Sequence, residues 1–298
     1  ASSACTERRA LAAQGTIDSM GIRLIGIDID GTLLNSKWQL PEANRKAIGE
    51  ATARGIEVVL VTGRRFDFAM PIARQLGSPL TLIVNNGALI KSQDGATHLR
   101  HLLPRDTAHK VLQATLPFRD GAAVMFDRPK ENQVIWEVLD WKDPVRAGYL
   151  QRNMEFIAQV APLENCLSED PIQVMFTGPV DRMRSLESQL RGWPQPEAFA
   201  LAYTEYELRN FALVDVINRA CSKGAALQEW ARVRGFPREE VMAIGDNHND
   251  REMLEFAGVP IVMGNSVAEL LKNGWHVTLS NDESGVAAAI EQFAFDRK

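Results

Sequence analysis

The chain has 298 residues, of which 45% are hydrophobic and 24% charged, as in globular proteins of about two domains. Its net charge of −5 gives no basic surface for nucleic acid. No apolar run reaches the roughly 18 residues of a membrane span. Three scattered cysteines, Cys5, Cys166 and Cys221, exclude a disulfide framework and favour the reducing cytoplasm. The composition thus predicts a soluble, cytoplasmic protein whose partners are neither nucleic acid nor membranes.

Residues 1–21, ASSACTERRALAAQGTIDSMG, differ in composition from the rest of the chain. They carry Arg8 and Arg9 but no continuous apolar stretch, so a signal peptide is not expected. An apolar strand begins directly after them, and we therefore interpret residues 1–21 as an N-terminal extension. Whether Met20 is the natural first residue stays open at this point.

From Ile22 onward, short apolar segments alternate with helical patterns. Strands are expected at residues 22–29, 57–61 and 80–85, with helices at about 41–54 and 66–76. The alternation returns late in the chain, with helices expected at 224–234, 249–256 and 267–272 and strands at 241–245 and 259–262. Apolar strands alternating with helices are typical of a parallel sheet covered on both faces. Residues 22–103 and 199–298 are therefore predicted to form one doubly wound, Rossmann-like α/β core.

The middle of the chain follows a different, antiparallel pattern. Asp94-Gly95 lies between two strand-like segments and is a hairpin signal. Further strands are expected at 122–126, 134–139 and 172–177, helices near 145–160 and 181–190, and a linker at 193–197. We interpret residues 104–198 as an α+β domain inserted into the core. Trp136 and Trp141 are expected in its apolar interior, with a stacking surface for substrate as the alternative.

Polar side chains follow the first two core strands where these strands end. Asp28 and Asp30 point the same way on an extended segment, so both carboxylates can flank one reacting atom. Thr62 and Gly63 precede a helix, and a hydroxyl with a tight turn at a helix N-terminus can cradle phosphate. Open α/β sheets hold ligands at the carboxyl ends of their strands, so these four residues are candidate site residues.

Two later segments bring charge to the same edge of the sheet. Lys223 opens a helix and supplies an ammonium group. Asp246, Asn249 and Asp250 follow a buried strand, and their carboxylate and amide oxygens suit a hard divalent cation. His248 lies among them and is expected to face solvent rather than to bind a metal.

Four motifs occur in order along the chain, namely DIDGTLL (Asp28–Leu34), VTGR (Val61–Arg64), SKG (Ser222–Gly224) and GDNHND (Gly245–Asp250). In this order they resemble the four signature motifs of the haloacid dehalogenase (HAD) superfamily. The insert between the second and third motifs is accompanied by NNGALI (Asn85–Ile90), VPIVMGNS (Val259–Ser266) and ESGVAAAI (Glu283–Ile290). This combination is similar to Cof-type phosphatases with a C2B cap (subfamily IIB). The resemblance covers about residues 22–293 and is weakest in the insert.

The resemblance implies roles for the candidate catalytic and phosphate-binding residues. Asp28 would be the nucleophile that forms an aspartyl-phosphate, and Asp30 the general acid for the leaving oxygen and then the base for water. Thr62 and the amide of Gly63 would hold the phosphoryl oxygens, and Lys223 would neutralise them. Positioning and positive charge supply most of the catalysis in phosphoryl transfer, which makes this small set of groups sufficient.

The resemblance also implies Mg²⁺ as cofactor. Its ligands would be the carboxylate of Asp28, the main-chain carbonyl of Asp30 and the carboxylate of Asp246. Asn249 would face the phosphate, and Asp250 would orient the catalytic lysine from behind. No soft ligand accompanies this all-oxygen set, so zinc is not expected.

The sequence therefore predicts a Mg²⁺-dependent phosphomonoesterase that acts on a small phosphorylated metabolite, with a sugar phosphate as the favoured class. A phosphotransferase or mutase of the same superfamily, such as a phosphomannomutase-like enzyme, is the enzymatic alternative. A catalytically silent ligand-binding regulator is the other alternative, and it predicts a damaged motif, which is not found. The substrate, the cap residues that contact it and the oligomeric state are not fixed by the sequence.

Overall fold

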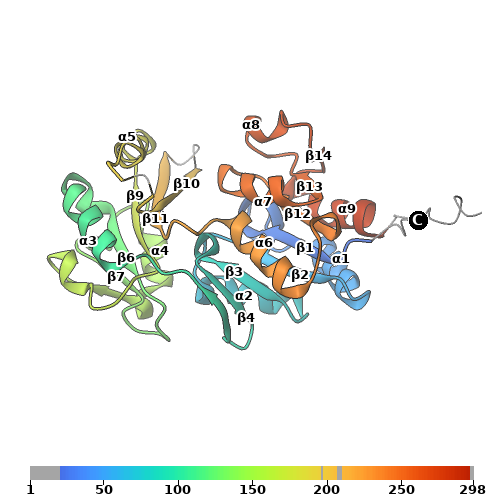
Figure 1. The fold of residues 1–298 in the computed structure, drawn as a ribbon, viewed down its shortest axis with the longest axis horizontal. Coiled ribbons are helices and arrows are strands. Elements are labelled where there is room, and N and C mark those ends of the chain that lie inside the picture. Colours follow the sequence, from blue (N-terminus) through green and yellow to red (C-terminus); the bar gives the residue numbers. More distant parts are fainter. Residues whose placement is uncertain (1–20, 196, 207–209, 296–298) are drawn as a thin grey trace, which may run out of the picture.

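The computed structural model describes residues 21–195, 197–206 and 210–295, so nearly all of the expected N-terminal extension lies outside the described residues. The chain forms two domains joined by two connecting segments (Figure 1). One domain contains an eight-stranded sheet in the order β14-β13-β12-β1-β2-β3-β4-β5. Its strands are β1 (Leu24–Asp28), β2 (Glu57–Val61), β3 (Thr81–Val84), β4 (Leu89–Ser92), β5 (Thr97–Arg100), β12 (Val241–Gly245), β13 (Val259–Val262) and β14 (His276–Val277). All neighbouring strands are parallel except β3–β4 and β4–β5, which pair antiparallel.

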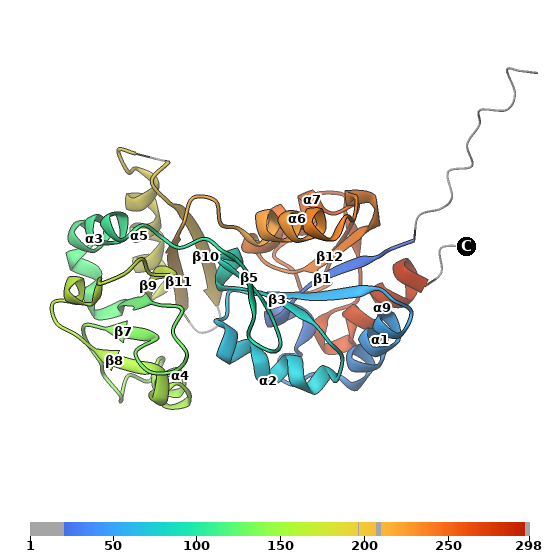
Figure 2. The ribbon, with the colours of Figure 1, turned by 60° about the horizontal axis from the view of Figure 1, so that its bottom comes forward.

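Helices cover both faces of this sheet (Figure 2). One face packs against α1 (Glu42–Ala53), α2 (Phe66–Leu76) and α9 (Gly285–Ile290), and the other against α6 (Lys223–Arg234), α7 (Arg251–Phe256) and α8 (Ala268–Leu271). Successive side chains of β1 point to opposite faces, so Ile25 and Ile27 join the first layer and Leu24 joins the second. This two-sided burial explains the near-continuous apolar strands and confirms the predicted doubly wound α/β core.

The second domain contains a six-stranded sheet in the order β10-β11-β9-β6-β7-β8. Its strands are β6 (Ala122–Met125), β7 (Val134–Trp136), β8 (Ile157–Gln159), β9 (Gln173–Gly178), β10 (Ala200–Tyr206) and β11 (Phe211–Ile217), and its helices are α3 (Arg105–Ala114), α4 (Ala147–Arg152) and α5 (Val180–Arg191). Helices α3 and α5 share one apolar cluster with this sheet. The domain is the predicted α+β insert. No helix in the described part of the chain is long and apolar enough to cross a membrane.

The C-terminal boundary of the insert lies further along the chain than the predicted residue 198. The strands β10 and β11 pair with each other, and β11 also pairs with β9, so both belong to the second sheet. Because these strands are hydrogen-bonded into the second sheet, the insert extends to Ile217, the last residue of β11. We call residues 104–217 the cap domain and the remainder the core domain.

Two further expectations within the cap domain need correction. The helix expected near 145–160 is shorter, because α4 ends before Asn153 and residues 157–159 pair with β7 as an edge strand. Trp136 is buried as predicted, at 1% exposed, whereas Trp141 is 40% exposed. Trp141 lies in a turn region between β7 and α4, where the cap domain does not cover it.

Arg65 of the core domain reaches across to the cap domain. Its guanidinium donates hydrogen bonds to the side-chain oxygens of Gln133 and Asn153 and stacks on Phe156, 3.9 Å from the ring centroid. The residue is only 7% exposed, so both domains bury it. A charged group that is buried and hydrogen-bonded in this way ties the two domains together, since separating them would remove its partners.

Candidate active site

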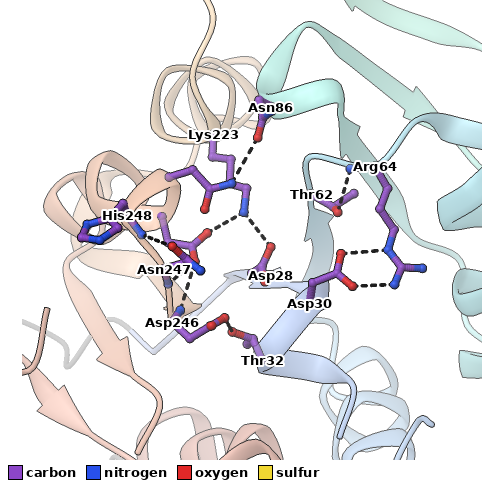
Figure 3. Close-up of polar contacts among 12 residues, drawn as sticks. Asp28, Asp30, Thr32, Thr62, Arg64, Asn86, Lys223, Asp246, Asn247 and His248 are labelled. Carbon is purple, nitrogen blue, oxygen red and sulfur yellow. Dashed lines mark hydrogen bonds and ion pairs between the residues drawn. The ribbon is translucent and has the colours of Figure 1, made fainter. Parts of the chain in front are cut away.

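The candidate site lies where the strand order of the core sheet reverses. After β1 the chain adds β2 and β3 on one side, and later β12 and β13 on the other. The carboxyl ends of these strands form a crevice that is the usual ligand site of doubly wound sheets. Asp28 ends β1, Thr62 follows β2 and Asp246 follows β12, and their side chains converge in Figure 3.

Asp28, Lys223 and Asp250 form a buried chain of ion pairs. The ammonium of Lys223 lies 2.6 Å from Oδ1 of Asp28 and 2.7 Å from Oδ1 of Asp250 (Figure 3). Burial raises the pKa of Asp28, and the neighbouring Asp250 adds to this despite the opposing charge of Lys223. Burial disfavours the charge on Lys223, but the two carboxylates outweigh it and raise the pKa of the ammonium. The structure thus presents a carboxylate oxygen beside a fixed cation.

Asp246 is fixed by its neighbours on two sides. The hydroxyl of Thr32 donates a hydrogen bond of 2.7 Å to Oδ1 of Asp246. Gly31 has a φ of 85°, and a Cβ at this position would lie 2.4 Å from Oδ2 of Asp246, so only glycine fits the turn. Burial, followed by the charge of Asp250, raises the pKa of Asp246 to about 7. The ionised form of Asp246 is therefore disfavoured unless a cation lies beside it.

Two of three neighbouring buried carboxylates have an oxygen available for a divalent cation. Oxygens of Asp28, Asp246 and Asp250 lie within 4.8 Å of one another. Asp250 uses Oδ1 for Lys223 and Oδ2 for the backbone N–H groups of Asp246 and Asn247, at 3.0 and 2.9 Å. Asp28 and Asp246 each have one oxygen that accepts no hydrogen bond within the described residues. A hard cation would stabilise the ionised form of these carboxylates against the burial and the neighbouring negative charges that raise their pKa values, so the donor set suits such an ion.

Asp30 has a separate partner, Arg64, to which sequence reasoning gave no role. The guanidinium of Arg64 donates hydrogen bonds of 2.8 and 2.5 Å to the two carboxylate oxygens of Asp30. Its guanidinium also lies against the ring of Phe68, 5.0 Å from the centroid. The adjacent TGR motif was visible in the sequence, but the direction of the Arg64 side chain was not.

Thr62, Gly63, Asn86 and Asn249 surround the space next to Lys223. The hydroxyl oxygen of Thr62 accepts a 3.1 Å hydrogen bond from the backbone N–H of Arg64 at the turn. A Cβ on Gly63 would lie 3.0 Å from Oδ1 of Asn86, and this same oxygen accepts a 3.3 Å hydrogen bond from Nδ2 of Asn249. Asn86 follows β3 and was not predicted as a site residue, although two asparagines and a glycine after a buried strand are a turn signal.

A cavity of about 920 Å³ opens beside this group of residues. Lys223, Asn86 and Asn249 line it from the core domain. Side chains of β10 and α5, among them Tyr203 and Leu190, line it from the cap domain. His248 is exposed, as expected, and its ring points away from the carboxylates in Figure 3. The eight predicted site residues therefore lie together at one edge of the sheet, next to an open cavity that residues of both domains line.

Comparison with known proteins identifies the family. A family model for haloacid dehalogenase-like hydrolases matches residues 25–290, and the chain belongs to this family. It is 32% identical to the phosphatase YwpJ of Bacillus subtilis over 89% of this chain and 98% of that protein. It is 31% identical to an HMP-PP phosphatase of Serratia proteamaculans, over 83% and 86% of the two chains. These matches confirm the resemblance to subfamily IIB and the prediction of an enzyme of the HAD phosphatase type.

Solved structures agree with this assignment. A haloacid dehalogenase-like hydrolase from B. subtilis matches with a TM-score of 0.77 and 27% identity, over 91% of this chain and 99% of that chain. One from Bacteroides thetaiotaomicron matches with a TM-score of 0.76 and 25% identity, over the same shares. The likeness extends across core and cap and confirms the predicted fold class.

Proposed function

We propose that the protein is a Mg²⁺-dependent phosphomonoesterase that hydrolyses a small phosphorylated metabolite through an aspartyl-phosphate on Asp28. The observation that carries the proposal is the separate placement of two neighbouring carboxylates. Asp28 is buried against Lys223, whereas Asp30, two residues later, is held by Arg64 and stays partly exposed, with 21% of its side chain accessible. One carboxylate is placed to attack, and the other can exchange a proton with the leaving group and with water.

The two half-reactions assign a step to each group. A carboxylate oxygen of Asp28 attacks the phosphorus, the bond to the ester oxygen breaks, and Asp30 gives its proton to the departing oxygen. Water then attacks the phosphorus of the aspartyl-phosphate, Asp30 takes a proton from it, and inorganic phosphate leaves as Asp28 is restored. Lys223, the hydroxyl of Thr62 and the amide of Gly63 hold the phosphoryl oxygens during both steps.

Asp28, Asp246 and the carbonyl of Asp30 would hold the Mg²⁺ ion in this proposal. When bound, the ion supplies positive charge that offsets the repulsion between an anionic nucleophile and a phosphate dianion. Asp250 keeps its oxygens on Lys223 and two backbone amides, which supports its role as the residue that orients the lysine.

The cavity supports a small substrate, and the relatives suggest its chemistry. Proteins similar to this chain are named as an HMP-PP phosphatase and, at 30% identity, as the 5-amino-6-(5-phospho-D-ribitylamino)uracil phosphatase YcsE of B. subtilis. We keep a sugar phosphate as the favoured class and the cytoplasm as the proposed location. No observation favours a mutase, because nothing in the described residues marks a second acceptor site. A silent regulator is disfavoured because the side chains of all four motifs assemble.

A panel of phosphorylated metabolites tests the proposal. Purified protein with Mg²⁺ should release phosphate from at least one sugar or nucleotide-precursor phosphate and from p-nitrophenyl phosphate. Asp28→Asn should release none, because an amide is a poor nucleophile. Absence of phosphate release from every compound, with folded protein and Mg²⁺ present, would refute the proposed activity.

A further inference from the structure

Asp215 is a buried carboxylate that the proposed reaction does not use. It is the one charged residue of β11, in the sequence FALVDVI, and it is 5% exposed. No cation contacts it within the described residues. Instead, the side-chain amides of Gln173 and Asn86 donate hydrogen bonds of 2.7 and 3.1 Å to its two oxygens. A buried charge without an ion pair is costly, so the position calls for a functional reason.

The contact with Asn86 crosses from the cap domain to the core domain. Asn86 has an oxygen and an NH₂ group on opposite sides of one planar amide. The ionised carboxylate of Asp215 has no proton to donate, so it accepts from the NH₂ group, which turns the oxygen of Asn86 towards Gly63 and Asn249. The oxygen then accepts from Nδ2 of Asn249, and this hydrogen bond sets the orientation of the Asn249 amide. One carboxylate in the cap domain thus determines how two successive amides point in the core domain.

The segment that carries Asn86 is held firmly. Asn85, Asn86 and Gly87 have φ angles of 50°, 54° and 96°, so three successive residues adopt the left-handed conformation. A Cβ on Gly87 would lie 2.2 Å from the carbonyl oxygen of Ser222, directly before Lys223. The backbone here packs closely against the start of α6, so the Cα position of Asn86 is fixed. Only the orientation of its side-chain amide can still change.

We propose that Asp215 is a positioning residue through which the docked cap domain orients the Asn86–Asn249 pair at the phosphate end of the active site. The NH₂ group of Asn249 then faces the phosphoryl oxygens only when β11 lies in place. This inference rests on the proposed function, since it takes Asn249 to contact the phosphate. It adds that the phosphate site is completed by a residue of the cap domain that does not touch the substrate.

Asp215→Asn tests the inference, because it keeps the shape but offers one acceptor oxygen to two donors. We expect kcat/KM for p-nitrophenyl phosphate to fall about tenfold, which is the usual effect of one misdirected hydrogen bond. The inhibition constant of inorganic phosphate should rise by a similar factor. Asp215→Glu keeps both oxygens and should restore much of the loss. Asp181→Asn, an exposed aspartate at the start of α5, is the matched control and should change neither value.

A double-mutant cycle separates positioning from a structural role. Asn86→Ala removes the intermediate amide and should weaken phosphate inhibition as much as Asp215→Asn does. In the Asn86→Ala background, Asp215→Asn should change either value by less than about twofold, because residues that act through one link are not additive. Independent, multiplying effects, or unchanged phosphate inhibition in Asn86→Ala, would overturn the inference even if Asp215→Asn does not fold. A wild-type protein without phosphatase activity would instead refute the proposed function.

Discussion

Arg64 donates hydrogen bonds to both carboxylate oxygens of Asp30, at 2.8 and 2.5 Å, while Asp28 receives its cation from Lys223 on another element. Two carboxylates that are two residues apart are thus held by different cations. A planar guanidinium fixes the direction of a carboxylate as well as its charge, which a single ammonium cannot do. We infer that Arg64 keeps Asp30 aimed for proton transfer.

Replacing Arg64 by lysine should therefore preserve the positive charge but leave the orientation of the Asp30 carboxylate less fixed. We expect kcat for a sugar phosphate to fall about tenfold, since a poor leaving group depends on general acid catalysis. The loss with p-nitrophenyl phosphate should be smaller, because nitrophenolate departs without much protonation. Steady-state kinetics with both substrates provide the measurement, and Arg74→Lys on the exposed face of α2 is the control. Equal losses with both substrates would contradict the assignment.

The two aspartates should differ in pre-steady-state kinetics. In Asp30→Asn, phosphorylation of Asp28 by p-nitrophenyl phosphate should proceed while hydrolysis of the phosphoenzyme loses its base. General bases typically contribute about 10²–10⁴-fold, so the intermediate should accumulate. Rapid quench should show a burst of about one equivalent of nitrophenol in this variant, as covalent catalysis requires, and none in Asp28→Asn. Turnover by Asp28→Asn would show that another residue is the nucleophile.

Metal removal should abolish activity reversibly. Dialysis against EDTA should bring phosphate release to background, and added Mg²⁺ should restore it. Ca²⁺ should inhibit, because its higher coordination number disturbs ligands arranged for a smaller ion. Asp246→Asn should raise the Mg²⁺ concentration needed for half-maximal activity. Full activity after exhaustive EDTA treatment would exclude an essential metal.

The stability of the protein should depend on pH through Asp215. Burial raises the pKa of this carboxyl group to about 7, although hydrogen bonds from Asn86 and Gln173 oppose the shift. Between pH 4 and pH 7 the folded state therefore keeps a proton that the unfolded state has lost. Protonation of Asp215 therefore stabilises the folded state at low pH. This stabilisation decreases as the pH rises above about 4 and is lost once the pH has passed 7.

Asp215→Asn removes this titration. The free energy of unfolding of the variant, relative to wild type, should increase by up to about 4 kcal/mol from pH 4 to pH 8. Urea unfolding at several pH values gives the difference curve, and Asp181→Asn should give a flat one. A flat curve for Asp215→Asn would show that Asp215 is ionised throughout this range.

Cap residues that line the cavity should affect substrates unequally. Trp193 lines it and packs edge-on against Phe199, 5.6 Å between ring centroids. Trp193→Leu should change kcat/KM by different factors across a panel of phosphate esters, because the lining contacts the leaving group rather than the phosphate. Trp141→Leu alters an exposed tryptophan of the cap domain away from the cavity and is the control. Uniform changes across the panel would argue against a specificity role.

Much of the core domain was predictable because its signals are local. The strands β1, β2 and β12 are apolar on both faces, and three of the four motifs occur at their carboxyl ends. The order of elements alone therefore predicted that Asp28, Thr62 and Asp246 lie together. The same reasoning missed β10 and β11. The sequence of β10, ALAYTEY, mixes polar and apolar residues on a partly exposed strand, and that of β11, FALVDVI, contains a buried aspartate. The place of β10 in the second sheet depends on β11, which is itself fixed by β9.

Contacts between distant residues could not be predicted in this way. Asn86 and Asp215 are 129 positions apart, and their hydrogen bond exists only because two domains pack against each other. A lone aspartate within an apolar strand was the available signal, and it indicates a buried partner without saying which. Arg64 and Asp30 are 34 positions apart, and either could have faced solvent.

The two segments that connect the domains run side by side (Figures 1 and 2). Nδ2 of Asn218, where the chain returns to the core domain, donates a 2.6 Å hydrogen bond to the carbonyl oxygen of Leu102, where it leaves. Insertions whose two ends are adjacent perturb a host fold least. The cap is thus a module that one exchange at this junction could replace, provided that the new cap offers Asn86 an acceptor in place of Asp215. Engineers could use the same junction to graft a different cap onto this core.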